Sequence, residues 1–136
     1  MTSDADRELR ILLVDDEKGY VDVLTKRLER RGMDVTGALS GTEALRLMRG
    51  NDFDVAVLDL KMEDMDGIEV LDVFKRMAPE MPVIMLTGHG SRQAARQGMA
   101  RGAFDYLTKP CELEQLVEKI REAVAGGSPP PPNGAS

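Results

Sequence analysis

The stretch Asp54-Val55-Ala56-Val57-Leu58-Asp59 decides how this chain is organised. Its four central residues are apolar and two of them are β-branched, which is typical of a strand buried on both faces of a parallel sheet. The run ends at an acid, and core packing does not explain an aspartate at that position. Because ligands bind at the carboxyl edge of the strands in an open α/β sheet, Asp59 is expected to be a reactive carboxylate.

The sequence on both sides of this stretch repeats a strand followed by a helix. Five strands that alternate with five helices favour an α/β fold, with a parallel sheet, right-handed crossovers and helices on both faces. Few large apolar residues lie in the fourth helix, so we expect it to be anchored weakly. The strands are expected at 9–14, 33–39, 54–59, 82–87 and 103–107, and the helices at about 18–31, 41–50, 67–77, 91–101 and 113–124.

The predicted helices carry end signals. Gly32 is placed to end the first helix in a left-handed conformation. Ser40 and Glu43 have the spacing of a capping box at the start of the second helix. Asp34 and Thr36 interrupt the apolar residues of the preceding strand, so we expect that strand to lie near an edge of the sheet.

Length and composition limit the function classes. With 136 residues the chain favours one domain, and a net charge of -6 with a pI near 4.8 argues against binding to nucleic acid or a membrane surface. No apolar run has membrane-spanning length, residues 1–8 form a polar tail without signal-peptide character, and the single cysteine, Cys111, fits a reducing compartment. We therefore expect a cytoplasmic protein, folded over residues 9–125, with a disordered Gly/Pro-rich tail or linker at 126–136.

Polar residues follow four of the five predicted strands: Asp15, Asp16, Asp59, Thr87 and Lys109. Three carboxylates in one cleft repel each other unless one is protonated or a cation lies among them. Oxygen ligands without a nearby histidine or cysteine favour Mg²⁺. A metal, the Thr87 hydroxyl and the Lys109 ammonium would together surround a phosphoryl group on an aspartate. Asp59 is the best candidate for that aspartate because it lies at the centre of the edge.

Four motifs at successive strand ends, in this order, resemble the receiver domain of bacterial two-component response regulators. The resemblance covers residues 9–125, and the order of the motifs makes it more specific than any one of them. It implies a doubly wound (βα)5 domain of flavodoxin-like strand order 2-1-3-4-5. The motifs are Asp15-Asp16, then Asp59 with Met62, Met65, Asp66 and Gly67, then Thr87, and finally Lys109-Pro110.

The resemblance also implies the chemistry of the site. Asp59 would accept a phosphoryl group from a sensor histidine kinase or a histidine phosphotransfer protein, and Lys109 would bind the phosphate. Asp15, Asp16 and the backbone carbonyl of Lys61 would hold Mg²⁺ together with Asp59. The domain would then not be an enzyme, apart from its own phosphorylation and dephosphorylation.

The resemblance further implies a switch. Thr87 and Tyr106 match the switch pair of the family, and Lys61 and His89 occupy positions that tune phosphate lifetime. Phosphorylation would change the surface formed by the fourth helix, the fifth strand and the fifth helix. That surface would control a downstream target protein or a fused effector domain, or support a dimer that forms on phosphorylation.

A few residues depart from the common family pattern without removing a required group. Glu63 stands where proline is frequent, Gly88 where alanine is common, and Cys111 where phenylalanine is usual. The family implies a cis peptide bond at Lys109-Pro110, which proline chemistry permits. The run Leu86 to Gly90 resembles receivers attached to ATP-dependent transcription activators, so the chain is compatible with a stand-alone receiver and with part of a longer regulator.

The same residues allow other interpretations. Asp15 and Asp16 could merely cap the first helix, and Tyr106 could be an ordinary aromatic at the sheet edge. Asp64-Met65-Asp66-Gly67 resembles the signature of haloacid-dehalogenase-type phosphatases, but the preceding strand has already ended at Asp59, so we reject that reading. A pseudo-receiver that binds partners without phosphorylation and a flavodoxin-like module for a small ligand are the alternative functions.

Overall fold

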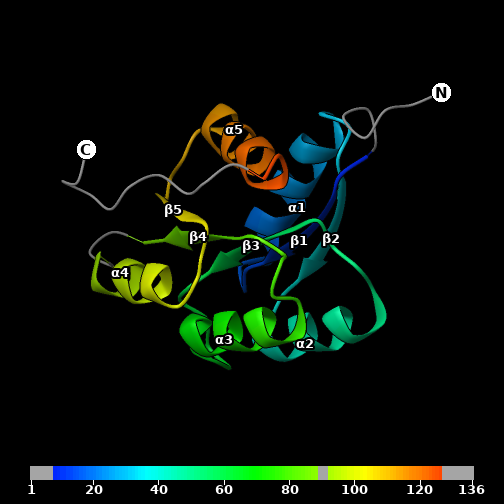
Figure 1. The fold of residues 1–136 in the computed structure, drawn as a ribbon. Helices are drawn as coiled ribbons and strands as arrows, with labels where there is room; N and C mark the ends of the chain where they lie inside the picture. Colours follow the sequence, from blue (N-terminus) through cyan, green and yellow to red (C-terminus); the bar gives the residue numbers. More distant parts are fainter. Residues whose placement is uncertain (1–7, 89–91, 127–136) are drawn as a thin grey trace.

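The computed structural model describes residues 8–88 and 92–126. The expected terminal tails lie almost entirely outside these residues, and so does His89. Strands and helices alternate along the whole described chain (Figure 1). They are β1 (Arg10–Val14), α1 (Lys18–Glu29), β2 (Asp34–Ala38), α2 (Gly41–Gly50), β3 (Val55–Asp59), α3 (Gly67–Met77), β4 (Val83–Thr87), α4 (Arg92–Ala100), β5 (Asp105–Thr108) and α5 (Leu113–Val124).

The five strands form one parallel sheet in the order β2-β1-β3-β4-β5, which confirms the predicted fold and the edge position of β2. The register brings the carboxyl ends of the central strands level with one another. Val14 pairs with Leu58, and Asp59 pairs with Leu86. Residues that follow β1, β3, β4 and β5 are therefore neighbours at one edge, as the parallel arrangement requires.

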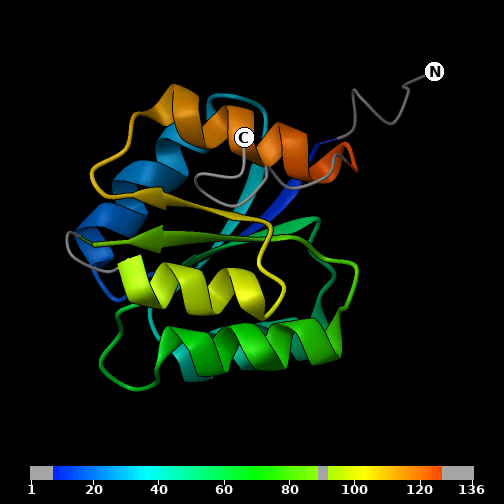
Figure 2. The same ribbon diagram turned by 60° about the vertical axis from the view of Figure 1, so that its left-hand side comes forward.

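Helices cover both faces of the sheet. Figure 1 and Figure 2 show α1 and α5 on one face and α2, α3 and α4 on the other. Each face has its own hydrophobic cluster, and all five residues of β3 are buried between the two. The core is mainly aliphatic, with Phe74 of α3 as its largest fully buried side chain. Among the described helices, none is long and apolar enough to cross a membrane.

The helix ends follow the predicted signals with one difference. Gly32 has φ +84°, the left-handed conformation expected after α1. The hydroxyl of Ser40 accepts a 3.0 Å hydrogen bond from the Glu43 N–H, but the Glu43 carboxylate accepts from the N–H of Leu39 and not from that of Ser40. The predicted capping box is therefore only half formed, because the Glu43 side chain bonds to the amide of Leu39, one residue before the amide that a capping box requires. The backbone at Ser40 is extended, which places the Leu39 amide within reach.

Helix α4 approaches the sheet through small residues. Ala95 and Gly98 are its buried positions, and a Cβ on Gly98 would lie 2.0 Å from the Sδ of Met85 in β4. An ion pair between Arg101 and Asp72 links its carboxyl end to α3. These contacts place α4 close to β4; its weak anchoring stays a prediction.

A close backbone approach at Gly67 gives a test of this packing. A Cβ on Gly67 would lie 2.5 Å from the Cα of Leu60, so the backbone itself would have to shift. Gly67→Ala is expected to lower the free energy of unfolding by about 2–3 kcal/mol, measured by urea denaturation. Gly19 of α1 has no heavy atom within 4 Å of such a Cβ. The matched variant Gly19→Ala is expected to be neutral or to stabilise by up to about 1 kcal/mol, and equal losses in both variants would contradict this account.

Candidate functional site

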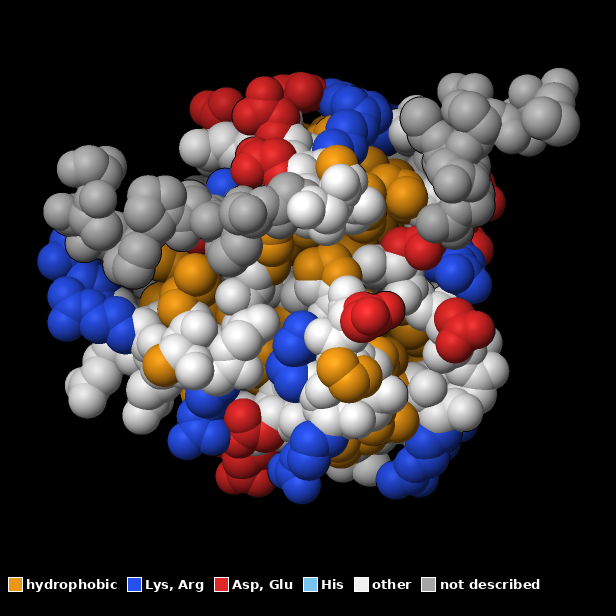
Figure 3. Space-filling model, viewed as in Figure 1, with side chains coloured by type: hydrophobic (Ala, Val, Ile, Leu, Met, Phe, Trp, Pro, Cys, Tyr) orange, Lys and Arg blue, Asp and Glu red, His pale blue; other side chains and the backbone are white. Residues whose placement is uncertain are grey.

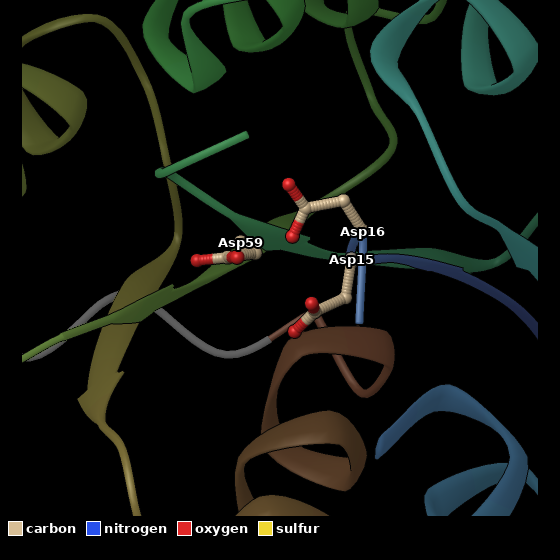
Figure 4. Close-up of side chains that lie close together, drawn as sticks. All are labelled: Asp15, Asp16 and Asp59. Atoms are coloured by element: carbon tan, nitrogen blue, oxygen red, sulfur yellow. The ribbon is translucent and has the colours of Figure 1, made fainter. Parts of the chain in front are cut away.

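Three carboxylates meet at the carboxyl edge of the sheet. Asp15 and Asp16 directly follow β1, and Asp59 is the last residue of β3. Figure 4 shows their side chains gathered around one space, and one carboxylate oxygen of each lies within 4.8 Å of the others. Asp15 is fully buried and Asp59 is 5% exposed, whereas Asp16 is only partly buried. The structure thus brings together the three acids that the sequence predicts as metal ligands.

Lys109 supplies positive charge to this group. Its Nζ lies 2.7 Å from the Asp15 Oδ2, 3.7 Å from the Asp59 Oδ2 and 3.6 Å from the Glu17 Oε1. Burial disfavours the ammonium form, but the hydrogen bond to Asp15 and the charges of Asp59 and Glu17 outweigh it and raise the pKa of Lys109. The lysine therefore stays charged, and its shortest bond is to Asp15.

The negative charge of Asp59 is less well balanced by Lys109 than that of Asp15. Burial raises the pKa of Asp59 to about 6, and the negative charges of Asp15 and Asp16 act in the same direction. A 3.2 Å hydrogen bond from the Lys61 N–H and the charge of Lys109 lower the pKa of Asp59 but do not cancel these effects. The site as a whole carries an excess of negative charge, which a bound cation would relieve.

The other hydrogen bonds of the acids bear on the helix-capping interpretation. Asp15 Oδ1 accepts from the N–H of Glu17, which precedes the first helical residue of α1. Asp16 Oδ2 accepts a 3.2 Å bond from the N–H of Glu63, in the loop after β3. Neither bond satisfies an amide in the first turn of α1, so the capping interpretation is not supported.

Thr87 and Tyr106 lie on neighbouring strands. Thr87 is 3% exposed; its hydroxyl lies 3.4 Å from the Leu107 carbonyl, and its own carbonyl accepts from the Lys109 N–H at 2.7 Å. Tyr106 is half-buried and packs with the cluster under α2, α3 and α4. Because side chains alternate along a strand and Met85 belongs to the same cluster, Thr87 and Tyr106 face the α4 side of the sheet. The peptide bond Lys109-Pro110 is cis, as the resemblance implied.

Sequence reasoning missed two residues beside the site. The ring centroid of Tyr20 in α1 lies 4.6 Å from the Nζ of Lys109, a cation–π contact, and burial raises the pKa of Tyr20 to about 12. An aromatic residue one helical turn after the acidic pair was the available signal. The second is Asp64, whose carboxylate bonds to the start of α2 and not to any strand end. That placement agrees with the rejection of the phosphatase signature.

The fold and the site together define a doubly wound α/β domain with an acidic centre and a lysine at its strand ends. A sequence model of the response regulator receiver domain matches residues 11–121, so the chain belongs to this family. The receiver domain protein from Clostridium thermocellum has a similar crystal structure, with a TM-score of 0.83 and 38% identity over 87% of this chain and 95% of that one.

Two longer relatives contain a similar domain. The transcriptional regulatory protein GlrR of Escherichia coli (strain K12) is 38% identical over 119 residues, which is 88% of this chain and 27% of GlrR. The crystal structure of NtrX from Brucella abortus in complex with ADP gives a TM-score of 0.84 at 30% identity, over 88% of this chain and 28% of that one. This chain thus spans about a quarter of the length of either protein.

The raised pKa of Asp59 leads to a test of stability against pH. Folding favours the protonated carboxyl, so ionisation of Asp59 lowers stability as the pH rises from about 4, where the unfolded chain ionises, through about 6. Without divalent cations, the free energy of unfolding of Asp59→Asn is expected to exceed that of the wild type by about 2 kcal/mol at pH 7.5. The advantage should shrink below pH 6 and vanish near pH 4 in urea unfolding series.

The exposed Asp52, just before β3, provides the control. Asp52→Asn is expected to change stability by less than about 0.5 kcal/mol at either pH. An Asp59→Asn advantage that does not depend on pH would contradict the electrostatic account of the site.

Proposed function

We propose that this receiver domain accepts a phosphoryl group on Asp59 from a phosphohistidine donor and uses it to change the surface around α4, β5 and α5. The observation that carries the proposal is the group of three acids around one space, with Lys109 beside two of them. Family membership supports the same reading.

The donor set fits a magnesium ion. Asp15, Asp16 and Asp59 offer three carboxylate oxygens within 4.8 Å of one another, and Mg²⁺ prefers oxygen ligands and keeps several waters. Burial, together with the charges of Asp15 and Asp16, raises the pKa of Asp59 despite the nearby Lys109, which supports a need for a further cation. The backbone carbonyl of Lys61 is proposed as a further ligand. When bound, the ion would neutralise phosphoryl oxygens during transfer.

The covalent step follows from this arrangement. A carboxylate oxygen of Asp59 attacks phosphorus, a P–O bond forms, and the P–N bond to the donor histidine breaks with its electron pair returning to the imidazole. Lys109 moves from Asp15 toward the phosphoryl oxygens and offsets their charge. The domain acts in this step only on itself, so it is proposed to be a phospho-accepting signalling domain rather than an enzyme with a separate substrate.

The switch follows on the α4 side of the sheet. In this proposal the Thr87 hydroxyl leaves the Leu107 carbonyl and turns to the phosphoryl group, and Tyr106 changes its position beneath α4. Figure 3 shows acidic side chains gathered over α5 and basic ones toward the α4 side, so a change in α4 alters a surface of mixed charge. Lys61 and His89 are proposed to tune phosphate lifetime.

The domain is proposed to act in the cytoplasm. Its partners would be a sensor histidine kinase or phosphotransfer protein and either a target protein or a fused effector domain. The name of GlrR describes transcriptional regulation, and a role of that kind is one proposed output. A dimer formed on phosphorylation is compatible with the same surface.

Phosphorylation by a small donor tests the central step. With acetyl phosphate and Mg²⁺, the wild type is expected to gain one phosphoryl group, detected by intact-protein mass spectrometry, and to gain none with EDTA. Asp59→Ala should gain none, because the nucleophile is absent. Asp34→Ala, which removes an exposed acid at the opposite end of β2, should behave as wild type. Absence of phosphorylation in the wild type, or equal phosphorylation of Asp59→Ala, would overturn the proposal.

The Tyr20 ring is expected to help hold Lys109 in the site. Tyr20→Leu removes the cation–π contact and should slow acetyl phosphate transfer about two- to tenfold. Tyr20→Phe keeps the ring face and should stay within about twofold of wild type. Single-turnover rates followed by mass spectrometry separate the two variants; a slow Tyr20→Phe would assign the effect to the hydroxyl instead.

A further inference from the structure

The loop between β3 and α3 touches the acidic site through its backbone. The N–H of Lys61 donates to Asp59 Oδ1, and the N–H of Glu63 donates to Asp16 Oδ2, both at 3.2 Å. Two of the three acids are thus oriented by amides of one loop. Any shift of this loop changes the direction of both carboxylates.

Asp64 ties the same loop to a different element. Its carboxylate accepts hydrogen bonds from the N–H groups of Gly41 and Thr42, each at 3.0 Å, and from the Thr42 hydroxyl at 2.9 Å. The two amides belong to the first turn of α2, where a negative charge also interacts favourably with the helix dipole. Chiefly because of the bonds from Gly41 and Thr42, the pKa of Asp64 is lowered.

The loop and the start of α2 are also in direct contact. A Cβ on Gly41 would lie 2.9 Å from the Sδ and 3.0 Å from the Cβ of Met65, so the two segments are closely packed. An antiparallel bridge between Lys61 and Asp66 closes the loop. The loop is therefore held at its base by this bridge and at its tip by Asp64.

We propose that Asp64 is a positioning residue of the phosphorylation site, which fixes the loop so that Lys61 and Glu63 hold Asp59 and Asp16 in the geometry that binds the metal. This inference rests on the proposed function. Asp64 itself touches neither phosphoryl group nor metal; it acts through the loop. This role would explain Asp64, the first acid of the Asp64-Met65-Asp66-Gly67 motif, after the phosphatase interpretation is rejected.

The amino end of α2 already has a cap of its own, and this separates positioning from ordinary helix stabilisation. The Ser40 hydroxyl accepts from the Glu43 N–H at 3.0 Å and belongs to the chain that enters the helix. Ser40 therefore stabilises α2 without connecting it to the loop. Loss of either cap weakens the same helix end, but only loss of Asp64 removes the hydrogen bonds that join the tip of the loop to α2.

The experiment compares Asp64→Ala, Asp64→Asn and Ser40→Ala in the full chain. Affinity for Mg²⁺ is measured by NMR titration of backbone amides with magnesium chloride, and phosphoryl transfer from acetyl phosphate by mass spectrometry at saturating Mg²⁺. Both alanine variants should lower urea stability. Only Asp64→Ala should also weaken Mg²⁺ binding, by about tenfold, the low end for lost ligand-supporting bonds, because Asp64 acts through the loop and not directly on a ligand. Asp64→Asn keeps one accepting oxygen and should fall between Asp64→Ala and wild type.

The outcomes separate this inference from the function on which it rests. A wild type that binds no Mg²⁺ and gains no phosphoryl group would overturn the proposed function itself. A normal wild type, with Mg²⁺ affinities unchanged in Asp64→Ala or lowered equally in Ser40→Ala, would overturn only the positioning role. Should Asp64→Ala fail to fold, the Asp64→Asn and Ser40→Ala pair carries the same comparison.

Discussion

The structure depends on the ammonium group of Lys109, which lies between two buried carboxylates. Lys109 bonds to Asp15 at 2.7 Å and reaches Asp59 only at 3.7 Å. A buried charge pair offsets the cost of its removal from water only when the two groups are in close contact. Asp59 lies too far from Lys109 for such a contact. The negative charge of the site is therefore not fully balanced, and a divalent cation, a proton or, under the proposed function, the rearrangement that accompanies phosphorylation would balance it.

The parallel sheet makes this incomplete site tolerable. Val55 to Leu58 are all buried, and their removal from water offsets the cost of the acid at the end of the strand. The order β2-β1-β3 places the end of β1 next to that of β3, which brings Asp15 and Asp16 beside Asp59 although more than forty residues separate them. The apolar stretch Val55 to Leu58 thus forms the centre of the sheet and also positions Asp59.

The acids and the lysine could be predicted from the sequence because each lies at or just after the end of a predicted strand, and parallel strands align their ends. Three helices have the expected bounds, and the other described bounds differ from expectation by at most two residues, mostly because each strand pairs from one or two residues after its apolar pattern begins. Tyr20 and Asp64 could not be predicted this way. The contact of Tyr20 depends on the rotation of α1 against β5, and that of Asp64 on a loop path that no periodicity encodes.

Strand β4 is the physical connection between the site and the surface that would report its state. Thr87 ends this strand one residue after Leu86, which pairs with Asp59. Met85, two residues before Thr87 and on the same face of the strand, packs so closely against Gly98 of α4 that a Cβ on Gly98 would have no room. A contact that close responds to small shifts, because packed interfaces adopt discrete arrangements rather than deform gradually. The small residues of α4 therefore hold it close to β4, and under the proposed switch a change at Thr87 would reach the helix through one short segment of the sheet.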